Sequence, residues 1–121
     1  KMLKILIAED DETSILHLKL SLRAMEYELL FANNGADTIS MCRQNEDLDM
    51  LLLDIKMPNV NGIEVIKEIR TYNKELIIII QTAYYATDFE KEAMEAGCNE
   101  FLNKPVSKTI LINTINKYFP Q

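Results

Sequence analysis

The sequence predicts an α/β fold in which a parallel β-sheet carries helices on both faces. Short runs of leucine and β-branched residues alternate along the chain with segments of helical periodicity. Two of these runs, 49–55 and 76–82, are apolar nearly throughout, which is typical of parallel strands that are buried on both sides. Strands and helices that alternate in this way require right-handed crossovers, and these place helices on both faces of the sheet.

The first part of the chain predicts two strands and two helices. Residues 3–10 form an apolar run that ends in acids, and we expect a strand there. The helix expected over 14–25 has one apolar face. That face carries Ile15, Leu18, Leu22 and Met25. The run 27–33 predicts the second strand, and the Asn-Gly pair after it predicts a turn into a helix over 35–45.

The middle of the chain predicts a strand, a helix and a second strand. The strands are the two apolar runs, 49–55 and 76–82. Between them, residues 62–72 have the helical period, with the apolar side chains on one face. Those side chains are Val65, Ile66, Ile69 and Tyr72.

The last part of the chain predicts a helix, a short strand and a closing helix. The helix over 87–96 begins with a capping box, Thr87 with Glu90, and Gly97 closes it. Residues 100–103 predict the fifth strand, and residues 107–119 predict the final amphipathic helix.

Size and composition predict one domain over residues 1–121, since the chain is long enough for a single core and has no linker. The net charge of −6 argues against direct contact with nucleic acid, which requires a basic surface. No apolar run approaches the ~20 residues of a membrane span, which excludes membrane contact of that kind. Two separated cysteines, Cys42 and Cys98, form no disulfide framework, so we expect a reducing, cytoplasmic setting.

Polar side chains follow the carboxyl ends of four predicted strands. In open parallel sheets ligands gather at this edge, where the strand order reverses. The residues there are Asp10 and Asp11 after the first strand, Asp54, Thr82 and Lys104. Three carboxylates in a partly dry site need more positive charge than one lysine supplies, and Mg²⁺ is the cation that best suits carboxylates and phosphate oxygens. The set therefore predicts a magnesium-assisted phosphoryl-transfer site, with Asp54 as nucleophile and Thr82 as a hydroxyl donor.

Five segments resemble the receiver domain of two-component response regulators, and the likeness extends over nearly the whole chain. The segments are LIAEDDE, LLLDIKMPNVNGIEVIKEIR, IIIIQTAYY, EAGCNEFLNKP and the closing helix. Each is weak alone, but together, in this order and spacing, they are highly specific. The resemblance implies a flavodoxin-like (βα)5 sandwich with strand order 2-1-3-4-5.

The resemblance also implies the roles of the site residues. Asp54 would accept a phosphoryl group from a histidine kinase or a histidine phosphotransfer domain. Asp10, Asp11 and Asp54, with the backbone carbonyl of Lys56, would organise Mg²⁺. Lys104 would contact the phosphoryl group and precede a cis Pro105, while Thr82 and Phe101 would move together as a switch. Such a domain promotes its own phosphorylation and dephosphorylation and is not an enzyme with a separate substrate.

The chain departs from the family pattern in two places. Asn59 and Asn61 replace a glycine and an aspartate in the loop after Asp54, and both tolerate turn conformations. Phe101 replaces a tyrosine common in the family, so any switching at this position would act through packing alone. We also expect Tyr84 to shield the acyl phosphate and prolong its life.

Weaker interpretations of the same residues remain open. Taken alone, Asp10 and Asp11 are more often acids that favour a helix start than metal ligands. Glu9 and Glu12 have no expected role beyond adding negative potential.

Other functions for the same fold remain alternatives to the phosphoacceptor. They are a pseudo-receiver without phosphoryl chemistry, a flavin-binding electron carrier and an aspartate-nucleophile phosphatase. The acids after the first strand oppose a flavin phosphate, and Lys56 stands where such a phosphatase has an acid. The segment from Thr82 to Pro105 resembles receivers attached to hybrid sensor histidine kinases, which favours that origin over a stand-alone receiver. A homodimer that depends on phosphorylation is a further candidate.

Overall fold

The computed structural model describes residues 2–58, 61–83 and 87–120. Five strands form one parallel sheet in the order β2-β1-β3-β4-β5. The strands are β1 (Lys4–Ala8), β2 (Glu28–Ala32), β3 (Met50–Asp54), β4 (Ile77–Thr82) and β5 (Glu100–Asn103). The helices are α1 (Glu12–Leu22), α2 (Gly35–Gln44), α3 (Gly62–Arg70), α4 (Thr87–Ala96) and α5 (Lys108–Tyr118). The α/β class, the parallel sheet and the predicted strand order are confirmed.

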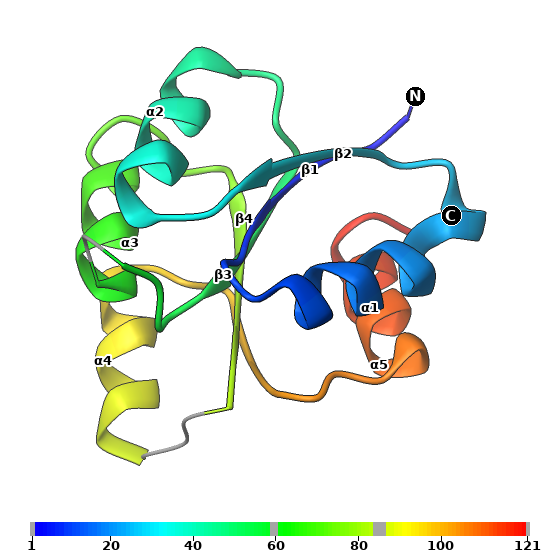
Figure 1. Cartoon of the computed structure of the whole chain (residues 1–121). Coiled ribbons are helices and arrows are strands. Elements are labelled where there is room, and N and C mark those ends of the chain that lie inside the picture. The colour runs from blue at the N-terminus through cyan, green and yellow to red at the C-terminus, as the bar shows by residue number, and fades with distance from the viewer. Residues whose placement is uncertain (1, 59–60, 84–86, 121) are drawn as a thin grey trace.

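The molecule has three layers, with α1 and α5 on one face of the sheet and α2, α3 and α4 on the other (Figure 1). Side chains alternate between the two faces along each strand. In β1, Ile5 and Ile7 belong to the core under α1 and α5, whereas Leu6 and Ala8 belong to the core under α2, α3 and α4. All residues of β3 are buried, as expected for a central strand that is covered on both sides.

The end of β1 differs from the sequence prediction. The strand stops at Ala8 and not at residue 10, because the next carboxylate turns the chain. Glu9 Oε2 accepts hydrogen bonds from the backbone N–H groups of Asp10 (3.1 Å) and Asp11 (3.2 Å). The chain then enters α1 at Glu12, two residues before the predicted start.

The other helix boundaries follow from local chemistry. Asn34, Asn61 and Ser107 each accept a backbone hydrogen bond from the first turn of the helix that follows, as N-cap residues do. The predicted helix 14–25 ends in a 3₁₀ turn, Arg23–Met25, and Glu26 then adopts the left-handed conformation with φ of 56°.

Helix α4 has the bounds that the sequence predicts, 87–96. Gly97 closes it with a φ of 118°, a conformation that side chains rarely adopt. The side chain of Thr87 lies outside the described part of the structure, so the capping box with Glu90 stays a prediction. Within the described residues, no helix combines the length and apolar character that a membrane crossing requires.

Candidate functional site

The carboxyl ends of β1, β3, β4 and β5 meet at one edge of the sheet, because neighbouring strands are parallel and in register. Asp54 is the last residue of β3 and is 6% exposed, and Thr82 is the last residue of β4 and is fully buried. Lys104 directly follows β5. Its backbone N–H donates to the Thr82 carbonyl at 2.8 Å, which fixes the start of the loop. The Lys104–Pro105 peptide bond is cis.

The ammonium group of Lys104 joins two strand ends. Its Nζ donates to a carboxylate oxygen of Glu9, to Asp54 Oδ2 at 3.1 Å and to Ser14 Oγ at 3.4 Å. The Lys104 side chain is 17% exposed and that of Glu9 is fully buried. The predicted lysine therefore does reach the predicted acceptor, and it pairs with a second, deeply buried carboxylate.

Burial and hydrogen bonding act in opposite directions on the pKa of Glu9 and on the pKa of Lys104. Burial raises the pKa of Glu9, and the hydrogen bond from Lys104 offsets only part of that effect. Burial alone would lower the pKa of Lys104, but hydrogen bonds to Glu9 and Asp54 outweigh it and raise that pKa. Lys104 is therefore held firmly in its charged form.

Three carboxylates at this edge could share one cation. Oxygen atoms of Glu9, Asp10 and Asp54 all lie within 4.8 Å of one another, with Glu9 and Asp54 buried and Asp10 exposed. An all-oxygen donor set suits a hard cation such as Mg²⁺, which also keeps several waters. Three negative charges beside a single ammonium leave an excess that a dication would balance.

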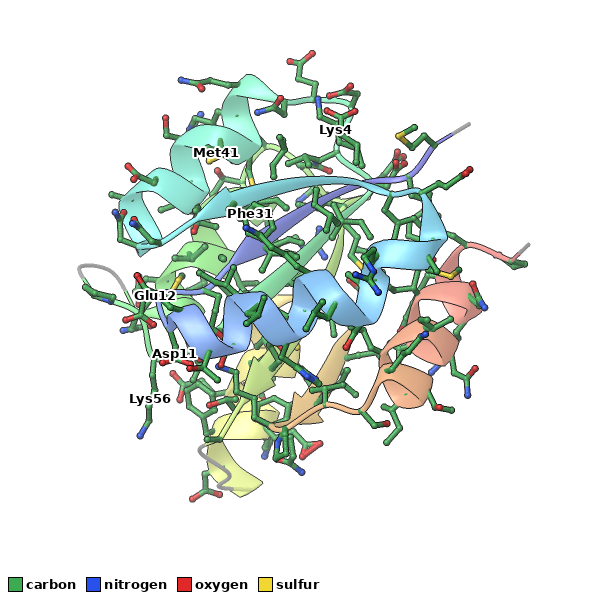
Figure 2. The ribbon with its side chains drawn as sticks, turned by 45° about the vertical axis from the view of Figure 1, so that its right-hand side comes forward. Lys4, Asp11, Glu12, Phe31, Met41 and Lys56 are labelled. Carbon is green, nitrogen blue, oxygen red and sulfur yellow. The ribbon has the colours of Figure 1, made fainter. Side chains whose placement is uncertain are left out.

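The carboxylate of Asp11 is not clustered with those of Asp10 and Asp54, with which it is predicted to bind Mg²⁺. Its Oδ2 accepts from the backbone N–H of Ser14 at 2.8 Å, which makes it the N-cap of α1. That hydrogen bond lowers the pKa of Asp11. Figure 2 shows Asp11 and Glu12 at the N-terminal end of α1. Asp11 is not among the three clustered carboxylates, so its role as a metal ligand stays a prediction.

Glu9 is the site residue that the sequence analysis missed. It is 1% exposed, pairs with Lys104 and belongs to the carboxylate cluster. A signal was present, because Glu9 directly follows the apolar run ILIA just as Asp54 follows MLLL. A charge after a buried strand needs a partner nearby, and that reasoning applies to both residues.

The loop after β3 begins with a hydrogen bond to the side chain of Asp54. The backbone N–H of Lys56 donates to Asp54 Oδ1 at 3.1 Å. The side chain of Lys56 extends away from the fold (Figure 2). Farther along the loop, Asn61 caps α3, whereas Asn59 lies outside the described residues. The Lys56 carbonyl stays a predicted metal ligand.

The two predicted switch residues lie on adjacent strands. Thr82 is buried at the end of β4. Phe101, in β5, is half-buried and packs edge-on against Phe89 of α4, with ring centroids 6.1 Å apart and an interplanar angle of 67°. This contact links the strand next to Thr82 to helix α4. Tyr84, which we expect to shield the acceptor, lies outside the described residues.

A parallel sheet with strand order β2-β1-β3-β4-β5 and helices on both faces defines the doubly wound α/β class, whose members bind ligands at the carboxyl edge of the sheet. Within that class, a model of the response regulator receiver domain family matches residues 5–116. The chain therefore belongs to the receiver domain family of two-component systems.

Individual relatives agree with this assignment. The chain is 36% identical over 102 residues to the transcriptional regulatory protein ZraR of Klebsiella oxytoca, covering 84% of this chain and 23% of that protein. It is 28% identical to the polar-differentiation response regulator DivK of Brucella anthropi, covering 94% of both. The receiver domain of Saccharomyces cerevisiae Ssk1, solved with the histidine phosphotransfer protein Ypd1, superposes with a TM-score of 0.88 at 26% identity, covering 97% of this chain and 88% of that chain. The chain spans less than a third of the length of ZraR.

Proposed function

We propose that residues 1–121 act as one cytoplasmic receiver domain whose Asp54 accepts a phosphoryl group from a phosphohistidine donor. A carboxylate oxygen of Asp54 attacks phosphorus, the bond between phosphorus and the histidine nitrogen breaks, and the imidazole leaves as the phosphoaspartate forms. The observation that supports this most strongly is the burial of Asp54 beside Lys104 within a cluster of carboxylates.

The residues around Asp54 fit a magnesium ion. Glu9, Asp10 and Asp54 supply carboxylate oxygens, and we assign the Lys56 carbonyl as a further ligand. Asp11, whose Oδ2 caps α1, is a further proposed ligand. The ion, when bound, offsets the charge of the phosphoryl oxygens. Lys104, already charged and within reach of Asp54, then pairs with a phosphoryl oxygen from the other side.

Phosphorylation then alters the surface through the switch residues. The Thr82 hydroxyl turns to donate to a phosphoryl oxygen, and the space that it leaves is taken up by Phe101. Because Phe101 packs on Phe89, this repacking reaches α4. Phe101 has no hydroxyl, so the switch depends on packing and on no hydrogen bond of its own.

A histidine kinase or a histidine phosphotransfer domain is the proposed donor. Leu16 and Leu20 on α1 and Ile110 on α5 are each more than half exposed, which leaves apolar surface on the same side of the sheet as Asp54. The Ssk1 receiver, a structural relative, was solved with a histidine phosphotransfer protein. A phosphorylation-dependent homodimer is a second proposed contact. Attachment to a hybrid histidine kinase remains a proposal about the parent protein.

Acetyl phosphate and Mg²⁺ test the proposal without a partner protein. We expect intact-mass spectrometry to show one added phosphoryl group on the wild type and on Asp37→Asn, an exposed aspartate changed in the same way. Asp54→Asn should gain none. A wild type that stays unmodified, or an Asp54→Asn variant that is modified equally, would favour the alternative, a pseudo-receiver without phosphoryl chemistry.

A further inference from the structure

A pocket lies between α1 and the loop that joins β5 to α5, next to the site just described. Its volume is about 390 Å³. Helix α1 contributes His17 and Leu18, and the loop contributes Pro105 and Val106. His17 Nε2 lies 2.8 Å from the Val106 carbonyl oxygen, so a hydrogen bond joins the two walls. Pockets that hold small organic molecules have volumes of roughly 300–1,000 Å³, so this space is large enough for one.

Gln81 of β4 also lines this pocket, and its side-chain amide nitrogen lacks a hydrogen-bond partner within the described residues. The residue is 2% exposed, and its Nε2 makes no hydrogen bond within the described part of the chain. Buried donors are almost always paired, because an unpaired one forfeits its hydration without compensation. Gln81 is also the register partner of Asp54 on the neighbouring strand. A buried donor at a pocket wall indicates that an occupant supplies the acceptor.

The chemistry of the lining defines the class of occupant. The side chains with hydrogen-bonding groups all carry donors, and no carboxylate is among them. They are Thr13, Ser14, His17, Gln81 and Lys104. An anion is disfavoured, because the charge of Lys104 is already matched by two carboxylates, Glu9 and Asp54. The remaining surface comes from Leu18, Ala83, Pro105 and Val106, which suits an apolar body.

We propose that this space, the Gln81 pocket, binds a small neutral organic molecule with an apolar body and a carbonyl-type acceptor for the Gln81 amide. Lys104 itself lines the pocket, so an occupant alters how freely Lys104 leaves Asp54 for a phosphoryl oxygen. The binding of this molecule does not depend on the proposed function. Its effect on the rate of phosphorylation rests on the proposed function.

Benzamide is a suitable probe because it combines an apolar ring with a neutral carbonyl group. Titration into ¹⁵N-labelled protein should give saturable NMR shifts at the Gln81 side-chain amide and at the backbone N–H groups of His17 and Val106. Gln81→Leu should weaken benzamide binding about tenfold, the loss expected for one hydrogen bond. Gln44→Leu, the same change at an exposed position on α2, should leave it unchanged. Toluene, which has no acceptor, should bind wild type and Gln81→Leu equally.

Three results obtained without a partner protein would overturn the proposal. The first is NMR shifts that do not saturate as benzamide is added, and the second is equal benzamide affinity of wild type and Gln81→Leu. The third is the appearance of the same NMR shifts when the protein concentration alone is raised, which would assign the pocket to a second copy of the chain. If Gln81→Leu fails to fold, Gln81→Met gives the same comparison with a flexible side chain. Shifts of these residues on adding Ypd1, without any from benzamide, would assign the pocket to a protein partner and would equally overturn it.

The rate of labelling by acetyl phosphate, with and without benzamide, separates this inference from the proposed function. A change of rate that disappears in Gln81→Leu supports both. Saturable binding in a protein that acetyl phosphate never labels supports the Gln81 pocket and contradicts the proposed function. Binding that leaves the labelling rate unchanged contradicts the coupling through Lys104.

Discussion

At the scale of single residues, the four consecutive acids after β1 have distinct roles. Glu9 is buried and pairs with Lys104, Asp10 joins the carboxylate cluster from the exposed side, and Asp11 caps α1. Glu12 is the first residue of the helix and is exposed. Equal charges at neighbouring positions therefore differ in burial and in partners, and their responses to substitution should differ accordingly.

Glu9→Gln should reduce the response to Mg²⁺ more than Glu12→Gln does. Both changes remove one negative charge and keep the shape, but only Glu9 lies in the cluster. We expect Mg²⁺ to raise the melting temperature of the wild type and of Glu12→Gln by similar amounts. A smaller rise in Glu9→Gln, measured by differential scanning fluorimetry, checks this expectation. Equal rises in all three proteins would remove Glu9 from the metal site.

Asp11→Asn distinguishes capping from metal binding. Asparagine is as good an N-cap as aspartate, so this variant should retain its stability, whereas its Mg²⁺ response should weaken because the predicted ligand loses its charge. Asp11→Ala should lose about 1 kcal/mol of unfolding free energy, the usual cost of a missing cap. Urea denaturation with and without Mg²⁺ measures both quantities. A Mg²⁺ response in Asp11→Asn equal to that of the wild type would remove Asp11 from the proposed metal site.

At the scale of elements, the sequence predicted most of the structure because buried strands and helix caps leave local signals. The bounds of β5 and α4 match the prediction, and the caps Asn34 and Asn61 follow ordinary turn chemistry. The end of β1 does not match the prediction. The turn there depends on the Glu9 carboxylate, which accepts hydrogen bonds from the backbone N–H groups of the next two residues.

Gly97→Ala should destabilise the protein by roughly 1–3 kcal/mol, the cost of an unfavourable backbone conformation. The φ of Gly97 is 118°, and an added Cβ would lie 2.9 Å from Cγ of Arg70. Arg70 also donates two hydrogen bonds to the Gly97 carbonyl, at 3.0 and 2.8 Å, and these tie α3 to the end of α4. Urea denaturation measures the loss. Ser40→Ala, on an exposed part of α2, serves as the control and should change little. A Gly97→Ala protein with the same unfolding free energy as the wild type would contradict the predicted cost of this backbone conformation.

At the scale of the whole molecule, the parallel topology brings together residues that lie far apart in sequence. The contact between Glu9 and Lys104 spans 95 positions, and it exists because β1 and β5 end at the same edge. The sequence indicated this convergence from strand patterns alone. It could not show which carboxylate pairs with the lysine, because that depends on side-chain geometry at the strand ends.

Alkaline destabilisation is expected from the buried thiols. Burial raises the pKa of Cys42 to about 12 and that of Cys98 to about 11, against 9.0 for an ordinary thiol. Above pH 9 the thiols of the unfolded chain release their protons, while those of the folded protein retain them. The free energy of unfolding is therefore at its full value below pH 9 and falls as the pH rises toward 11. One thiol contributes a slope of about 1.4 kcal/mol per pH unit. Urea denaturation from pH 8 to 10.5 should show a shallower fall in Cys42→Ala, and equal slopes would contradict this.

The central claim is that Asp54, and no other carboxylate of the cluster, carries the phosphoryl group. Borohydride reduces an acyl phosphate of aspartate to homoserine, which marks the modified position permanently. After treatment with acetyl phosphate, Mg²⁺ and then borohydride, peptide mapping by mass spectrometry should find homoserine at position 54 alone. Homoserine at position 10 or 11, or none at any position under conditions that preserve the fold, would contradict the claim.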